Sequence, residues 1–110
     1  MSELARVEAE FHGTRCVVRL FGEVDISNAK AIAQTIEASV PNDATELAVD
    51  LTDTRYLDSS GVSLLVRLAE RLKMRRQHLR LLVPADSPVR AILELTGLPS
   101  VMTVELALDG

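Results

Sequence analysis

Residues 47–83 read LAVDLTDTRYLDSSGVSLLVRLAERLKMRRQHLRLLV, and this stretch decides the fold because a helix pattern lies between two strand patterns. In residues 47–51 and again in residues 79–83, every second side chain is apolar and the others are mixed, which is typical of a strand with one buried face. Strands that alternate with helices predict an α/β fold with a mostly parallel sheet. Strands covered on both faces usually lack such alternation, so we expect helices mainly on one face.

The helix between these two strands is expected to begin near Ser60. After this point, apolar side chains recur at the three- and four-residue spacing of a single helix face. They form a stripe that we expect to be buried against the sheet and that consists of Gly61, Leu65, Leu68 and Leu72, supported by Leu64 and Ala69.

The sequence before this stretch continues the pattern. Residues 7–11 and 16–21 predict a β-hairpin around a turn at residues 12–14. Ser27 is expected to cap a first helix, because serine is a preferred N-cap residue, and residues 41–43 are expected to end it. The buried face of that helix is predicted to consist of Ala29, Ile32, Ala33, Ile36 and Val40.

The sequence after this stretch predicts one more helix and one more strand. Ser87 as a cap and Pro88 in the first turn favour a helix start, and Gly97 suits the left-handed position that ends a helix. A last strand is expected over residues 101–104. The predicted order is ββαβαβαβ in one domain of residues 1–110, with a mixed sheet of five strands.

The composition is that of an ordinary soluble globular domain. Apolar residues make up 47% of the 110 residues and charged residues 25%, which excludes a disordered chain. The net charge of −4 argues against nucleic-acid binding, which needs a positive field. The apolar runs are too short to span a bilayer and residues 1–10 do not form a signal peptide. We therefore expect a cytoplasmic protein without membrane insertion.

The sequence offers little support for catalysis or for a cofactor. A serine hydrolase would need a base near Ser60, but His12 and His78 fall near a turn and at the far end of a helix. Neither a phosphate-binding Gly-Lys loop nor a metal-ligand spacing occurs, and the basic residues of stretch 71–80 suit a helix C-terminus. Cys16, the single cysteine, is expected to be a buried structural thiol. We expect no enzyme, no catalytic residue, no metal and no cofactor.

The segment Asp58-Ser59-Ser60-Gly61 is the most informative one for function. It opens a helix whose first backbone N–H groups lack partners and carry the positive end of the helix dipole. A phosphate there would find donors, and Gly61 has no side chain to crowd it. In the competing interpretation, Asp58 or Ser59 caps the helix. Both hold if one residue caps the helix while Ser60 offers its hydroxyl outward.

Four segments of the chain carry a resemblance to a known protein family. They are residues 56–62, YLDSSGV; residues 22–25, GEVD; residues 49–51, VDL, followed by Leu57; and residues 93–98, LELTGL. With their order and spacing along the chain, they resemble, respectively, the Asp-Ser-Ser-Gly signature, the Gly-Glu-apolar-Asp element, the strand before the phosphorylation loop and the end of the third helix of bacterial anti-sigma-factor antagonists of the STAS domain family. The resemblance implies the β-α superhelix of that family.

The resemblance also implies a protein-binding switch. In this family a partner serine kinase, which is also the anti-sigma factor, phosphorylates the second serine of the signature, and this position implies Ser60, with Ser59 as the alternative. The unphosphorylated protein binds the kinase and frees a sigma factor, and a serine phosphatase resets the cycle. The expected partner surface consists of Asp25, Asp58, Ser59, Ser60, Gly61, Val62, Ser63 and Val66.

Several alternatives stay open. The family usually has a C-terminal helix, but only residues 105–110 follow the last expected strand, so that helix is short or absent. Asp25 and Asp58 are expected either to bond the Ser60 hydroxyl and orient its loop, or only to form a turn and a cap. The alternative function is a STAS scaffold that is never phosphorylated, or an accessory subunit of a lipid-transport complex. The sigma factor and the oligomeric state stay unknown.

Overall fold

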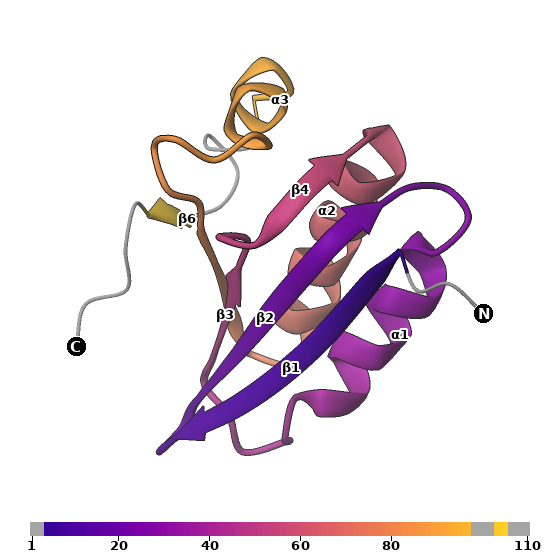
Figure 1. The fold of residues 1–110 in the computed structure, drawn as a ribbon. Coiled ribbons are helices and arrows are strands. Elements are labelled where there is room, and N and C mark those ends of the chain that lie inside the picture. Colours follow the sequence, from indigo (N-terminus) through magenta and orange to yellow (C-terminus); the bar gives the residue numbers. More distant parts are fainter. Residues whose placement is uncertain (1–3, 98–102, 106–110) are drawn as a thin grey trace.

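The computed structural model describes residues 4–97 and 103–105 as a six-stranded sheet with three helices (Figure 1). The elements are, in chain order, β1 (Ala5–His12), β2 (Arg15–Val24), α1 (Ala29–Ser39), β3 (Glu46–Asp50), β4 (Thr54–Leu57), α2 (Ser59–Met74), β5 (His78–Leu82), α3 (Arg90–Leu95) and β6 (Thr103–Glu105).

The sheet opens with the predicted hairpin and continues with parallel strands. β1 and β2 pair antiparallel through a turn in which Gly13 has φ 63°, a left-handed conformation that glycine adopts without strain. The pairs β2–β3, β3–β5 and β5–β6 are parallel. The neighbouring order is β1-β2-β3-β5-β6. The α/β class, the hairpin and the mostly parallel sheet are confirmed.

A sixth strand, β4, was not predicted from the sequence. It pairs parallel with the second half of β2, while the first half of β2 pairs with β3. In β4 only Thr54 and Leu57 are buried, and the two residues between them are exposed, so no alternation marks a strand. Thr54 donates a hydrogen bond of 2.7 Å from its hydroxyl to the backbone oxygen of Leu20. This bond ties β4 to the middle of β2.

The core lies between one face of the sheet and the helices α1 and α2, which cover that face (Figure 1). The one-sided cover predicted from alternation is confirmed, and so are the buried faces of both helices, although Ala33 and Ala69 are half-buried at their edges. Cys16 is fully buried, and burial raises the pKa of its thiol. Its sulfur donates to the backbone oxygen of Ser39 at 3.7 Å. The structural interpretation of Cys16 is therefore confirmed.

The helix-free face of the sheet carries ion pairs between neighbouring strands. Glu46 on β3 accepts hydrogen bonds from Arg15 on β2 at 2.7 Å and from Arg80 on β5 at 2.9 Å. The stems of such side chains can cover apolar atoms. Val17 and Ala48 alternate with Arg15 and Glu46 onto the same face and are buried although neither α1 nor α2 covers that face.

Two predicted helix starts are displaced. Ser27 does not cap α1, because its backbone N–H and its hydroxyl both bond the Asp25 carboxylate, and Asn28 takes the N-cap position without a capping bond. Ser87 accepts a bond from the Val89 backbone at 3.3 Å, but α3 begins only at Arg90. The predicted helix end is correct, since Gly97 follows α3 with φ 73°.

The structure tests the predictions for the C-terminal part of the chain only in part. The last strand, expected over residues 101–104, appears as β6 over Thr103–Glu105. Residues 98–102 and 106–110 lie outside the described residues, and with them the question of a C-terminal helix. Among the described helices, none has the length and apolar character needed to cross a membrane.

Candidate functional site

The start of α2 is organised by Asp58. Its carboxylate oxygen Oδ1 accepts hydrogen bonds from the backbone N–H groups of Ser60 at 2.9 Å and Gly61 at 3.2 Å, while its backbone oxygen accepts from Val62 N at 3.0 Å. Asp58 is therefore the N-cap of α2, as the capping interpretation predicts. Two of the backbone N–H groups that the sequence analysis expected to bind a phosphate therefore already donate to the Asp58 carboxylate.

The two serines of the motif have different surroundings. Ser59 is exposed, whereas Ser60 is half-buried on the flank of α2 that faces α1. Within residues 4–97, the Ser60 hydroxyl has no hydrogen-bond partner. The expectation that one residue caps the helix is confirmed for Asp58, but Ser60 is half-buried and Ser59 is the more exposed of the two serines. The assignment of Ser60 therefore rests on the motif.

Gly61 has a packing role in the structure. It is buried, and a Cβ atom at this position would lie 2.2 Å from Leu57 Cδ1 and 3.3 Å from Val24 Cγ1. The absence of a side chain lets α2 begin directly against the ends of β2 and β4. A contact between Gly61 and a phosphate or a partner stays a prediction.

Asp25 belongs to a loop that lies beside the start of α2. The Asp58 backbone N–H donates to the Val24 backbone oxygen at 3.3 Å, which joins the two loops. Hydrogen bonds from the hydroxyl and then from the backbone N–H of Ser27 lower the pKa of the Asp25 carboxyl. Asp25 therefore forms a turn, the second of the two interpretations offered for it, and its carboxylate does not bond Ser60.

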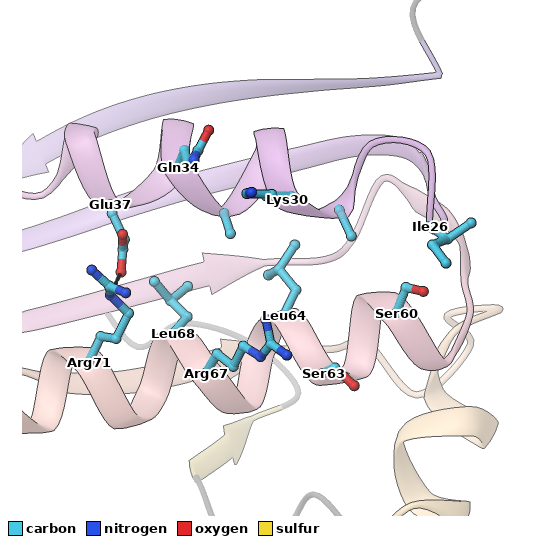
Figure 2. Close-up of a pocket in the computed structure, with 12 residues that line it drawn as sticks. Ile26, Lys30, Gln34, Glu37, Ser60, Ser63, Leu64, Arg67, Leu68 and Arg71 are labelled. Carbon is cyan, nitrogen blue, oxygen red and sulfur yellow. Dashed lines mark ion pairs between the residues drawn. The ribbon is translucent and has the colours of Figure 1, made fainter.

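The remaining predicted contact residues divide between two flanks of α2. Val62 and Val66 are half-buried against the core, on the flank away from α1. Ser63 is exposed and lies at the rim of the groove that Ser60 also lines. Ile26, which the sequence analysis missed, is 85% exposed and lies near Ser60 in Figure 2. An isoleucine in a polar loop gives no periodic signal, and only its exposure identifies it.

A groove of about 520 Å³ runs between α1 and α2 and begins at Ser60. Its floor is apolar and includes Leu64 and Leu68. Lys30 from α1 and Arg67 from α2 also line it, and Figure 2 shows these side chains between the Ser60 end and the ion pair of Arg71 with Glu37. Sequence analysis missed this groove because its walls come from two different helices, α1 and α2, which are separated along the chain by β3 and β4.

The histidines and the metal-binding side chains do not add chemistry to this site. His12 and His78 line a separate hollow with Glu46 on the helix-free face of the sheet, whereas Ser60 lies on the helix side. In the described part of the chain, no group of three His, Cys, Asp or Glu side chains is placed to hold a metal ion. The site consists of a capped helix start, two serine hydroxyls and a groove with cations.

Comparisons with known proteins agree with this architecture. The family model described as "Mlab, STAS domain" matches residues 7–104. An anti-sigma-B factor antagonist from Listeria monocytogenes is 29% identical over 84 residues, which are 76% of this chain and 73% of that protein.

Solved structures show the same similarity. An anti-sigma factor antagonist from Mycobacterium paratuberculosis has a TM-score of 0.79 at 29% identity and covers 96% of this chain and 88% of its own. The anti-sigma factor antagonist SpoIIAA in its unphosphorylated form has a TM-score of 0.71 at 25% identity, covering 94% and 90%. The family match spans nearly the whole described sheet and all three helices. The chain belongs to the STAS domain family.

Proposed function

We propose that this protein is an anti-sigma-factor antagonist that binds an anti-sigma serine kinase in its unphosphorylated form and thereby frees a sigma factor. The observation that carries the proposal is the start of α2, where the Ser60 hydroxyl lies without a hydrogen-bond partner among the described residues beside the exposed Ile26. Relatives with 29% identity are named anti-sigma factor antagonists, which supports this role. The site of action is the cytoplasm.

The proposed partner surface is centred on the exposed part of this helix start. Ser59, Ser63 and Ile26 offer solvent-exposed contacts, and Val62 and Val66 extend them along the far flank of α2. Asp25, Asp58 and Gly61 shape the surface, because the first two fix the loops and the third lets the helix approach β4. An exposed isoleucine at the rim of a groove is a suitable anchor for a partner, since covering it removes apolar surface from water.

The proposed modification is phosphorylation of Ser60, with Ser59 as the alternative. The serine Oγ attacks the γ-phosphorus of ATP, the new O–P bond forms as the bond to ADP breaks, and the hydroxyl proton passes to a base of the kinase. In this proposed reaction the chain supplies only the acceptor hydroxyl, and the kinase supplies the base and the ATP. A serine phosphatase reverses the step by transferring the phosphoryl group to water.

Phosphorylation is expected to block binding through charge. A phosphoserine adds about −1.5 to −2 charges at neutral pH, and this charge must lose water when a partner covers it. A loss of roughly 3–4 kcal/mol weakens binding by two to three powers of ten. The Asp58 carboxylate, one residue from Ser59, makes the uncovered site negative already.

The experiment compares the parent with Ser60→Ala, Ser60→Asp and Ser59→Ala for binding to the serine kinase encoded by the same genome. We expect Ser60→Ala to bind as tightly as the unphosphorylated parent, both before and after incubation with ATP. We expect Ser60→Asp to bind more weakly than the unphosphorylated parent. Peptide mapping after phosphorylation should place the phosphate on Ser60. Phosphate on Ser59 in a protein with Ser60 intact contradicts the assignment, and unweakened binding of Ser60→Asp contradicts the switch.

A second candidate function is a STAS scaffold that is never phosphorylated, such as an accessory subunit of a lipid-transport complex. The observation that favours it is the family description, which names Mlab and not a sigma-factor regulator. Purification of the tagged protein from its own cells, with and without phosphatase treatment, separates the two. A kinase recovered more strongly after phosphatase treatment supports the switch, whereas transporter subunits recovered equally in both samples support the scaffold.

A further inference from the structure

The groove between α1 and α2 carries two cations that are not neutralised. Lys30 and Arg67 are exposed and form no ion pair with any described residue. The neighbouring Arg71, by contrast, is paired with Glu37 across the same groove. A chain with a net charge of −4 therefore has a locally positive groove at this place.

The Ser60 side chain lies on the same flank of α2 as Arg67. Seven residues separate them, which is close to two helical turns, so they point to the same side. Helical side chains lean towards the N-terminus of their helix, and Figure 2 shows the Arg67 guanidinium beside Leu64, displaced towards the Ser60 end. Lys30 lies across from it on α1. A group that extends from Ser60 along the groove approaches the Arg67 guanidinium first, because the Lys30 ammonium points away from Ser60 in Figure 2 and must turn to meet it.

The start of α2 is less suitable for a phosphate than this groove. The backbone N–H groups of Ser60 and Gly61 already donate to the Asp58 carboxylate. A phosphate at the helix start would compete with that carboxylate and would lie beside a like charge, which is unfavourable. The groove offers cations instead of an anion.

We propose that a phosphoryl group on Ser60 turns into the groove between α1 and α2 and pairs with Arg67 and Lys30 in place of capping α2. This inference rests on the proposed function for the occurrence of the modification, but the pairing depends only on the geometry of this chain. The paired phosphate fills the groove end beside Ile26. Phosphorylation then changes the surroundings of Ile26, the proposed anchor, as well as the charge of the partner surface.

The test uses protein with phosphoserine incorporated at position 60 during synthesis, so that no kinase is needed. Phosphorus NMR follows the second ionisation of the phosphate, whose ordinary pKa is about 6. Pairing with cations favours the dianion, so we expect Arg67→Gln to raise this pKa by several tenths of a unit, and Lys30→Gln to raise it less. The matched control is Arg71→Gln, whose cation is already paired with Glu37 and should change the pKa far less.

A second readout is the Nε–H resonance of Arg67, which should shift and exchange more slowly with water in the phosphorylated protein. Amide spectra of every variant check that the fold is intact. Equal pKa values in the parent and Arg67→Gln, or equal effects of Arg67→Gln and Arg71→Gln, overturn the proposal. A different result would contradict the proposed function itself: the phosphoserine protein would bind the kinase as tightly as the unmodified protein. The failure of the pairing and the failure of the proposed function are therefore distinguishable.

Discussion

Gly61 is the residue whose replacement most directly tests how α2 packs at the site. In Gly61→Ala the added Cβ would lie 2.2 Å from Leu57 Cδ1 and 2.7 Å from Leu57 Cγ. Leu57 is buried and has little room to move, so we expect the free energy of unfolding to fall by about 1–3 kcal/mol, the usual cost of overpacking. Urea denaturation measures this change.

The control for this substitution is Ser63→Ala on the exposed side of the same helix. It introduces the same side chain and should change stability by less than about 0.5 kcal/mol. A Gly61→Ala protein as stable as this control would contradict the packing role and would return Gly61 to the ligand-contact role suggested by the motif.

At the residue scale the sequence predicted the helix cap but not the surroundings of the two serines. Asp58 was recognised as a possible cap because aspartate is a preferred N-cap residue, and the structure confirms it. The orientation of Ser60 could not be predicted, because it depends on the position of α1, which lies outside the local sequence. For the same reason the motif did not reveal Lys30 or Ile26, which come from a different element.

Among the elements, β4 is held to β2 by backbone pairing and by a buried side-chain hydrogen bond from Thr54. In Thr54→Val the shape is nearly kept, but the hydrogen bond to the Leu20 backbone oxygen is lost and a buried polar group stays unpaired. We expect the free energy of unfolding to fall by about 1–3 kcal/mol. Hydrogen exchange should also become faster at the β4 amides. Thr52→Val is the control, because Thr52 is exposed and bonds the Asp50 carboxylate; equal effects of the two variants would refute this account.

The elements that sequence analysis identified are those with a sustained period. α1 and α2 present an apolar face over 11 and 16 residues, and such a length makes the helical spacing unmistakable. β4 has 4 residues, and its partner β2 lies about thirty positions earlier, so the chain gives no local sign of the pairing. The misplaced starts of α1 and α3 arise because Ser27 and Ser87 bond their own loops instead.

The stability of the whole molecule should depend on the ion pairs of the helix-free sheet face. Burial acts to raise the pKa of Glu46, but the hydrogen bonds from Arg80 and Arg15 outweigh it and lower the pKa below its ordinary value of 4.5. A carboxyl with a lowered pKa in the folded state stabilises the fold above its ordinary pKa and loses this effect as the pH falls through the lowered value.

We therefore expect the free energy of unfolding to decrease as the pH falls below 4.5, and Glu46→Gln to show a weaker decrease than the parent. Urea denaturation at a series of pH values measures both. Glu70→Gln is the control, since Glu70 is exposed on α2 and should keep the full pH dependence of the parent. If Glu46→Gln and the parent lose stability in parallel, the acid sensitivity has another origin.

The shared pairing of β2 also has a consequence for the speed of recognition. β2 bonds β1 along its length, β3 in its first half and β4 in its second, and the loops that carry Asp25 and Asp58 leave the ends of β2 and β4. These loops are joined by the bond from Asp58 N to Val24 O. For the proposed partner we therefore expect association without the slowing that a conformational change of these loops would cause.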